Sequence, residues 1–242
     1  MQLVTAANAA FVRYLTNLET QCRLLGYPVQ VYDLGGLGRG VSAEVHHPTF
    51  QQRGHYHQMH GAWHTKALHK PKIVQDALKD DLLVYLDADA CPVQRFDEIW
   101  DHDFDIGVTV RDPHEPHSAI LGKINAGVIF LRPSAKPFLS RWVTLTRELG
   151  NDQLALNALI QEPGIRVHKF PTRIYNYYYF PEKPGPEVKI YHFKQDPQVR
   201  PWFDHFVAAQ AVRANPAGCP PDAPVVRSAA AVGTASTAAS SL

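Results

Sequence analysis

The sequence predicts an α/β fold with a mixed, mostly parallel central sheet flanked by helices, and three observations carry this prediction. The chain opens with the pattern of a strand, a helix and a second strand. The segment Leu82–Leu86 is an almost continuous apolar run, as expected of a strand buried on both faces. Strand-like and helix-like segments then alternate to about residue 161. The 242 residues, 45% of them hydrophobic, suffice for one large domain of this kind.

The first three elements lie between Leu3 and Asp33. Leu3–Ala6 is a short apolar run typical of a strand, and Asn8 is the expected N-cap of the helix that follows. Apolar side chains then recur at helical spacing, at Phe11, Leu15, Leu18, Cys22 and Leu25. Gly26 ends this helix, and the alternating segment Pro28–Asp33 is the next strand.

An irregular segment separates this opening from the central strand. Residues 34–62 are rich in glycine and histidine without a sustained period, so we expect a long loop or a partly helical insertion. The pattern from Thr65 to Leu78 predicts a helix that is entered or restarted near Pro71. The apolar run Leu82–Leu86 follows this helix and predicts a strand at the centre of the sheet.

Beyond the central strand the alternation continues. We expect a short helix near Phe96–Trp100, strands at Ile106–Val110 and Ala126–Leu131, and helices at Pro137–Glu148 and Asp152–Gln161. From residue 215 onward the chain is dominated by Ala, Pro, Ser, Val and Thr without aromatic residues, so it cannot bury enough surface to offset the entropy of ordering. The sequence therefore predicts a domain at residues 1–210 and a disordered tail at residues 211–242.

Composition narrows the classes of partner and compartment. The 24 Lys and Arg residues against 23 Asp and Glu residues give a formal charge of +1, so we expect no general attraction to nucleic acid. The three cysteines are widely separated and predict neither a disulfide framework nor a zinc knuckle, which fits a reducing compartment. No signal-peptide pattern and no membrane-spanning apolar run is found, so we expect a cytoplasmic protein.

The sharpest chemical feature is the motif Asp87-Ala88-Asp89, which directly follows the buried strand. In open α/β sheets, ligands gather at the carboxyl ends of strands. Two carboxylates at this place suit a hard divalent cation, and Mg²⁺ or Mn²⁺ commonly completes its coordination with phosphate oxygens of a substrate. The alternative is that the two side chains cap the following helix or are solvated, but uncompensated charge beside a core is costly.

Further motifs accompany the acidic pair in a fixed order: Val4–Asn8, Lys70–Leu78, Asp87–Asp89, Ile124–Phe130, Asn151–Asn157, and finally Ile190–Phe193 with Arg200–Trp202. In this combination the chain resembles the GT-A nucleotide-sugar glycosyltransferases, and among them the glycogenin-like retaining family. The resemblance runs from about Leu3 to Trp202. It implies the GT-A (Rossmann-like) form of the predicted fold and a nucleotide-sugar donor.

The resemblance also implies which residues bind the donor. The first strand and turn would cradle the base, Asp33 would face the nucleoside, Lys70 would reach the donor, and the small residues at the start of a later strand would admit the sugar. The residues implied in donor binding are Thr5, Ala6, Asn8, Asp33, Lys70, Asp87, Ala88, Asp89, Asn125, Ala126, Gly127, Lys194 and Arg200.

The implied metal ligands are Asp87, Asp89 and His192, with Mn²⁺ (or Mg²⁺) as the cofactor. The carboxyl-terminal block departs from the glycogenin-like pattern, because the expected glycine after His192-Phe193 is missing and the basic residue lies farther along. Lys194 or Arg200 could therefore bind the diphosphate, and the sequence leaves that choice open.

The catalytic candidates implied by the resemblance are Asp152 and Gln153, at the start of a helix and near the reacting carbon of the sugar. The predicted function is transfer of a sugar from a nucleotide-diphosphate donor, such as a UDP-sugar, to a carbohydrate or glycoconjugate acceptor with retention of configuration. The aromatic run Tyr175–Phe180 is a candidate stacking surface for the acceptor, and core packing explains some of its rings equally well.

Two other functions remain open at this point. A haloacid-dehalogenase-like, Mg²⁺-dependent phosphatase also places Asp-x-Asp after an apolar strand, but Cys91 occupies the place of its usual hydroxyl. A non-catalytic module that binds a nucleotide sugar would share the same residues. The histidines at 46, 47, 55, 57, 60 and 64 could form a second metal site, although their irregular spacing favours loop histidines near an acceptor cleft.

Overall fold

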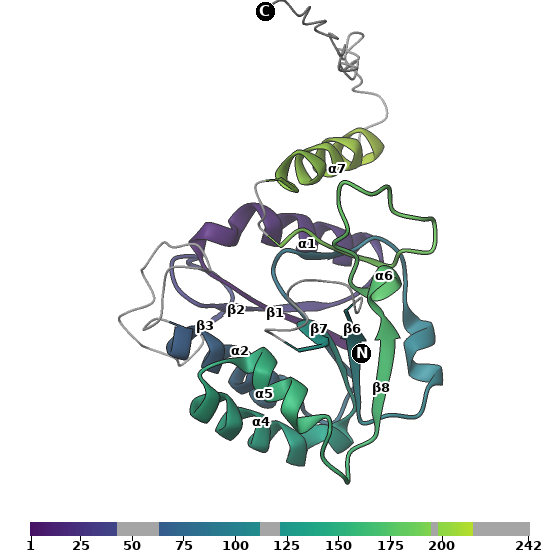
Figure 1. The fold of residues 1–242 in the computed structure, drawn as a ribbon. Helices are drawn as coiled ribbons and strands as arrows, with labels where there is room; N and C mark the ends of the chain where they lie inside the picture. The colour runs from purple at the N-terminus through teal and green to yellow at the C-terminus, as the bar shows by residue number, and fades with distance from the viewer. Residues whose placement is uncertain (43–62, 112–121, 195–197, 215–242) are drawn as a thin grey trace, which may run out of the picture. The chain divides into compact units, whose positions relative to one another are not determined.

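In a computed structural model of the chain, residues 1–42, 63–111, 122–194 and 198–214 are described (Figure 1). The chain divides into two compact units, Met1–Asp204 and the residues from His205 onward. Helix α7 spans Arg200–Ala214, and its residues from His205 onward are the described part of the second unit. Residues 43–62 of the predicted loop 34–62, with all its histidines, and the chain from 215 onward lie outside the described residues. The division into a domain and a disordered tail therefore stays a prediction.

A seven-stranded sheet forms the centre of the first unit, in the order β3-β2-β1-β4-β7-β6-β8. Strand β7 is antiparallel to both of its neighbours, and the other neighbouring pairs are parallel. The strands are β1 Gln2–Ala7, β2 Val29–Asp33, β3 Val41–Ser42, β4 Leu83–Leu86, β6 Ile106–Val110, β7 Ile124–Leu131 and β8 Val167–Pro171. A separate antiparallel pair joins β5, Ala90–Pro92, to β9, Ile190–His192. The predicted mixed, mostly parallel sheet is confirmed.

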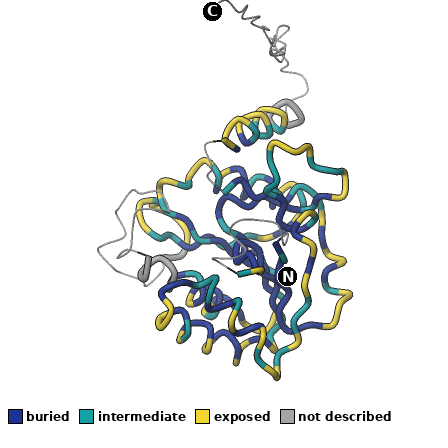
Figure 2. The backbone as a smooth tube through the Cα atoms, in the orientation of Figure 1, coloured by how far each residue is buried: buried dark blue, intermediate teal, exposed yellow. Residues whose placement is uncertain are grey.

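Helices cover both faces of this sheet, and Figure 1 shows α2, α4 and α5 grouped on one side and α1 on the other. The helices are α1 Val12–Leu24, α2 Trp63–Ala77, α4 Lys136–Leu149, α5 Asp152–Leu159 and α6 Thr172–Tyr175. One apolar cluster contains side chains from each helix of the first group, namely Ile73 of α2, Trp142 of α4 and Leu156 of α5. Leu18 and Cys22 of α1 pack with the opposite face in a second cluster. The tube in Figure 2 shows the strands as the buried layer between them.

Most predicted elements are present, with shifts at their ends. Asn8 caps a 3₁₀ turn at Ala9–Phe11, where its Oδ1 accepts from the Ala10 amide, and α1 begins only at Val12. Strand β7 begins two residues before the predicted start, and α5 ends at Leu159. The short helix expected near Phe96–Trp100 is a 3₁₀ helix at Asp97–Asp101, with Pro133–Ala135 a second one before α4.

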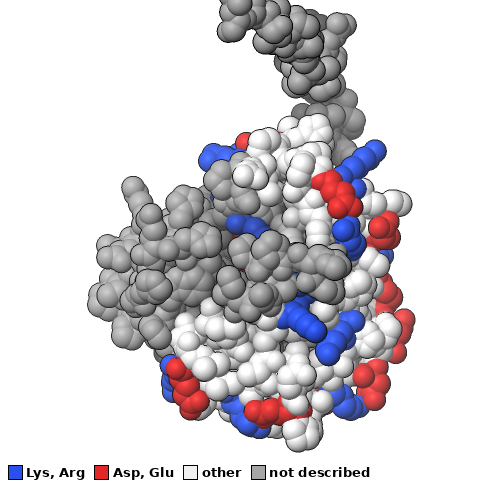
Figure 3. Space-filling model, in the orientation of Figure 1, with Lys and Arg blue, Asp and Glu red and all other residues white. Residues whose placement is uncertain are grey.

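Charged side chains of both signs alternate over the described surface in the view of Figure 3, in keeping with the net charge of +1.

One buried carboxylate stabilises the sheet edge. Asp105 accepts hydrogen bonds from Arg166 Nη2 at 2.6 Å, from the Arg166 amide at 2.9 Å and from Ser134 Oγ at 2.5 Å. Among the described helices, none is long and apolar enough to cross a membrane.

Replacing Asp105 with asparagine is expected to lower the free energy of unfolding by about 1–2 kcal/mol at neutral pH. The Arg166 hydrogen bonds hold the pKa of Asp105 well below its usual range, against the opposing effect of burial. Because a depressed pKa stabilises the fold only while the carboxylate is ionised, the difference should shrink as pH falls below about 4. Urea unfolding at several pH values measures this. Asp103→Asn is the control, because Asp103 pairs with the same arginine while 79% exposed, and it should change stability by less than about 0.5 kcal/mol.

Candidate functional site

The site lies where β4 ends and β7 begins. Because β7 is antiparallel, its first residues meet the carboxyl end of β4, and the Asp87 amide donates to Gly127 O at 2.8 Å. The β6–β7 register jumps from Val108–Ile129 to Thr109–Asn125, so residues 126–128 have no partner on β6. Because of this break, the backbone of Ala126 is hydrogen-bonded to side chains of the site and not to β6. Ala126 O accepts from Lys70 Nζ, and Ala126 N donates to Gln153 Oε1.

Asp87, Asp89 and His192 form the one group of candidate metal ligands found in the described parts of the chain. Their ligand atoms all lie within 4.8 Å of one another. His192 Nε2 is 3.3 Å from Asp89 Oδ1 and 4.0 Å from Asp87 Oδ2. The small β5–β9 sheet brings the histidine to this place, because Ala90 pairs with His192 in its register. The predicted ligands are thus brought together by a strand pair that the sequence did not predict.

These residues fit a divalent cation in both chemistry and space. Two carboxylates and an imidazole are suitable ligands for Mn²⁺, and carboxylates also suit Mg²⁺. Gly127 keeps the space between them open, since a Cβ there would overlap the His192 ring and would lie 2.9 Å from Asp87 Oδ2. Burial is the largest influence on the pKa of Asp89 and raises it, but His192, a backbone hydrogen bond and Lys70 together bring the pKa below its usual value. Asp89 is therefore held as a carboxylate although it is buried.

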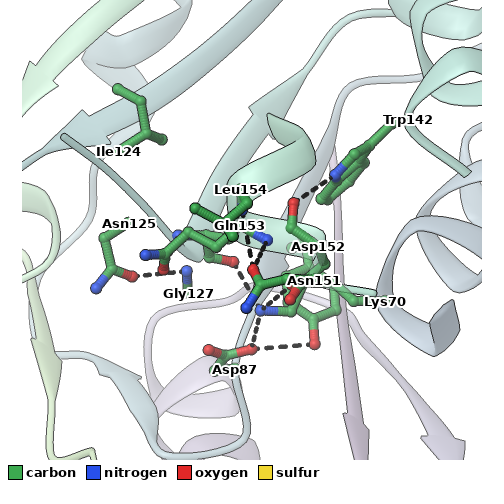
Figure 4. A network of polar contacts seen from close by, with 12 residues as sticks. Lys70, Asp87, Ile124, Asn125, Gly127, Trp142, Asn151, Asp152, Gln153 and Leu154 are labelled. Carbon is green, nitrogen blue, oxygen red and sulfur yellow. Dashed lines mark hydrogen bonds and ion pairs between the residues drawn. The ribbon is translucent and has the colours of Figure 1, made fainter. Parts of the chain in front are cut away.

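Lys70 connects the acidic motif to the start of α5, as the close-up in Figure 4 shows. Its Nζ lies 2.9 Å from Asp87 Oδ1, 3.2 Å from Asp152 Oδ2 and 3.0 Å from Ala126 O. Tyr85 adds a hydrogen bond from its hydroxyl to Asp87 Oδ1 at 3.2 Å. One ammonium group thus compensates two partly buried carboxylates, which would otherwise repel each other.

The amino-terminal turn of α5 holds Asp152 and Gln153 in place. Asn151 caps the helix, because its Oδ1 accepts from the amides of Gln153 and Leu154, each at 2.9 Å. Trp142 Nε1 donates to Asp152 O at 2.8 Å, and Figure 4 shows this contact behind the cap. Asn151 therefore fixes the start of the helix that carries Asp152 and Gln153, next to the start of β7.

Arg111 is a site residue that sequence reasoning missed. It is buried, follows directly after β6, and donates from Nη2 to Gln153 Oε1 at 3.3 Å. Ala126 N donates to the same oxygen at 3.3 Å. Both partners are obligate donors, so the amide of Gln153 has a fixed orientation. The signal that could have found Arg111 is its position after a strand on the carboxyl edge of the sheet. Tyr85, Thr109 and Asn176 were missed as well.

The residues predicted to face the nucleoside lie at the ends of β1 and β2. Asp33 closes a turn, where its carboxylate accepts from the amides of Gly35 at 2.7 Å and Gly38 at 3.2 Å. Asn8 caps the turn after β1, Ala6 is partly buried, and Thr5 is fully buried within β1. Ala88 packs in one small apolar cluster with the end of β1 and with Leu37. Their roles in donor binding stay predictions.

The two basic candidates of the carboxyl-terminal block lie in different surroundings. Lys194 has a φ of 51°, uncommon for a residue other than glycine, and its Nζ lies 2.9 Å from the centroid of the Tyr178 ring. That ring is edge-on to His192 at 6.4 Å between centroids. Arg200 begins α7 with its side chain 63% exposed, 4.0 Å from Asp204. Lys194 is thus linked to the metal candidate through the Tyr178 ring. Arg200 has a comparable link through Tyr14, whose pKa is raised by burial and by the charge of Asp89 and lowered by the charge of Arg200.

The fold and the placement of the acidic motif define the class: a GT-A fold, with Asp-x-Asp at the carboxyl end of the central strand. No protein-family model matches the chain, and no curated protein sequence matches it. Its fold is similar to that of several solved glycosyltransferases.

A glycosyltransferase involved in glycosylation of the major capsid of PBCV-1 matches with a TM-score of 0.55 and 14% identity, over 86% of this chain and 100% of that chain. The galactosyltransferase LgtC, in complex with donor and acceptor sugar analogs, matches with a TM-score of 0.55 and 15% identity, over 88% and 96%. The glycosyltransferase GlyE of Streptococcus pneumoniae matches with a TM-score of 0.52 and 13% identity, over 93% of this chain and 66% of that chain. The likeness at these identities is one of fold.

Proposed function

We propose that this chain is a metal-dependent glycosyltransferase that moves a sugar from a nucleotide-diphosphate donor, most simply a UDP-sugar, to a carbohydrate or glycoconjugate acceptor with retention of configuration. The observation that carries the proposal is the convergence of Asp87, Asp89 and His192 beside the capped start of α5. Fold similarity to glycosyltransferases supports it. Lys70 joins the two groups, because its Nζ lies 2.9 Å from Asp87 Oδ1 and 3.2 Å from Asp152 Oδ2.

The donor's diphosphate would be held at the acidic motif, where a bound Mn²⁺ or Mg²⁺ supplies Lewis-acid stabilisation of the leaving group. Asp87, Asp89 and His192 would hold this cation. Lys70 would change partners, because its ammonium group can turn from Asp87 to the diphosphate once the carboxylate has a metal to bind. Lys194 would add a second positive charge from the side of β9. Together these charges stabilise the departing nucleoside diphosphate.

The sugar would lie against the start of β7. Asn125, Ala126 and Gly127 offer backbone and amide groups there, and the missing β6 partners leave room for sugar hydroxyl groups. Asp152 would stabilise positive charge that develops at the anomeric carbon, from a carboxylate that lies 3.2 Å from Lys70 Nζ. Gln153 would act as a positioning group, because Arg111 and the Ala126 amide already occupy its carbonyl oxygen.

The acceptor would bind on the side of Tyr178 and Tyr179. Their rings stack at 4.8 Å between centroids, and both are partly exposed. Aromatic faces bury the apolar faces of carbohydrates, and this surface adjoins His192. Tyr175 and Tyr177, in contrast, are buried in the core and take no part in this surface.

Titration calorimetry with UDP, in the presence and absence of Mn²⁺, tests the proposed function. We expect wild-type binding that depends on the metal, and a loss of at least about 100-fold in affinity for Asp89→Asn, because one anionic ligand is removed. Asp97→Asn is the matched control: this exposed aspartate of the 3₁₀ helix pairs with Arg95 and should leave binding unchanged.

A wild-type protein that binds neither UDP nor another nucleoside diphosphate with Mn²⁺ or Mg²⁺ would contradict the proposal. Metal-dependent release of phosphate from phosphate monoesters would then favour the phosphatase. Such an activity would lack its usual hydroxyl, since the side chain at that place is the buried Cys91, which accepts a hydrogen bond from Asn17.

A further inference from the structure

A buried hydrogen-bonded chain runs from the backbone of β7 to the imidazole of His192. Thr109 Oγ lies 3.5 Å from Asn125 O, Asn176 Nδ2 lies 2.8 Å from Thr109 Oγ, and Asn176 Oδ1 lies 2.8 Å from His192 Nδ1. Thr109 and Asn176 are both fully buried, and His192 is 5% exposed. The mechanism proposed above uses His192 but assigns nothing to the two residues behind it.

The direction of each hydrogen bond follows from the fixed end of the chain. Asn125 O can only accept, so the hydroxyl proton of Thr109 points to it and the Thr109 oxygen is left as an acceptor. Asn176 must then direct its NH₂ group to Thr109 and its carbonyl oxygen to His192. An oxygen facing Nδ1 requires a proton on Nδ1, so Nε2 is the ring nitrogen that can serve as a metal ligand, on the opposite side of the ring.

The opposite side of the ring faces the place proposed for the cation, because Nε2 lies 3.3 Å from Asp89 Oδ1 and 4.0 Å from Asp87 Oδ2. Without a metal these carboxylates can themselves accept a proton from Nε2, so the orientation of the ring is inferred from its Nδ1 side. A metal ligand needs the nitrogen lone pair, and the second nitrogen of a ligating histidine usually donates to an oxygen that fixes the ring. The reverse arrangement would put the proton on Nε2 and would block this nitrogen from a metal.

We propose that Thr109 and Asn176 are positioning residues that hold the His192 ring through its Nδ1 and so keep Nε2 directed at the place of the divalent cation. The inference rests on the proposed function for the identity of the cation, but the hydrogen bond between His192 Nδ1 and Asn176 Oδ1 is present in the metal-free chain. This role also accounts for the full burial of the Asn176 side chain at the end of α6.

The test is the affinity for Mn²⁺, followed by electron paramagnetic resonance of the free ion. Loss of an outer partner of a metal ligand typically weakens binding by about 10- to 100-fold, and we expect this for Asn176→Leu and Thr109→Val. Thr109→Ser keeps the hydroxyl and should restore wild-type affinity within about threefold. Because Thr109→Val preserves shape, a general packing defect would affect the serine variant at least as much.

Unchanged Mn²⁺ affinity in Asn176→Leu and Thr109→Val, or an equal loss in Thr109→Ser, would overturn the inference. Failure of the proposed function has a different signature, namely variants that lose Mn²⁺ affinity as expected in a protein that binds no nucleoside diphosphate with the metal. That result would keep the role of Thr109 and Asn176 and would remove the role given to the cation in sugar transfer. A wild-type protein that binds no Mn²⁺ would overturn both.

Discussion

Replacing Gly127 with alanine is expected to weaken metal-dependent UDP binding by at least about 100-fold while the chain still folds. A Cβ at this position would overlap the His192 ring and would approach Asp87 Oδ2 and Asn125 Oδ1, each at 2.9 Å. Gly127 lies in β7 without a positive φ, so the substitution adds volume and no backbone strain. Since the methyl group displaces the ligands themselves, calorimetric titration with UDP and Mn²⁺ should detect the loss directly.

Gly107→Ala is the matched control for Gly127. It also adds a Cβ within a buried strand, but there the Cβ would lie 2.7 Å from the Phe170 ring and 3.1 Å from Phe130. We expect this variant to lose about 1–3 kcal/mol of stability through overpacking and to bind UDP with Mn²⁺ normally at a temperature where it is folded. Normal binding by Gly127→Ala would show that its ligands do not converge as described.

Replacing Lys70 with methionine is expected to separate the binding of metal from the binding of nucleotide. Without the ammonium group at 2.9 Å from Asp87, Mn²⁺ alone should bind at least as tightly as in wild type. UDP with Mn²⁺ should bind about 10- to 100-fold more weakly, equivalent to about 1.4–2.8 kcal/mol, because the diphosphate loses its cationic partner. Sugar transfer should fall by about 100-fold or more, since the lost charge acts on the leaving group.

Lys72→Met is the control on the same helix, because Lys72 is about half exposed and pairs with Asp76 four residues along the helix. It should leave both affinities unchanged. The two affinities can be measured on one preparation, first with Mn²⁺ and then with UDP added at saturating metal. A parallel loss of both affinities in Lys70→Met would mean that the lysine acts by holding the site together and makes no contact with the diphosphate.

Some features of the candidate site depend only on residues that are close together in the sequence. The acidic motif and the cap of α5 are local: an apolar run followed by Asp87, and Asn151 followed by a helical pattern, are complete within a few residues. In the structure Asn151 caps this helix, and its Oδ1 accepts two hydrogen bonds from the first turn. Such features can be predicted because the physical cause and the residue lie together in the sequence.

By itself, the sequence determined the α/β class, the central strand and the placement of Asp87 and Asp89 at its carboxyl end, because hydrophobic periodicity and burial are local properties. Only the tertiary structure decided that β7 is antiparallel, that β5 pairs with β9, and that His192 thereby reaches the acidic motif. Arg111 and Asn176 join the site in the same way. Strand pairing and the burial of loop residues depend on contacts between distant segments, and no local period encodes those contacts.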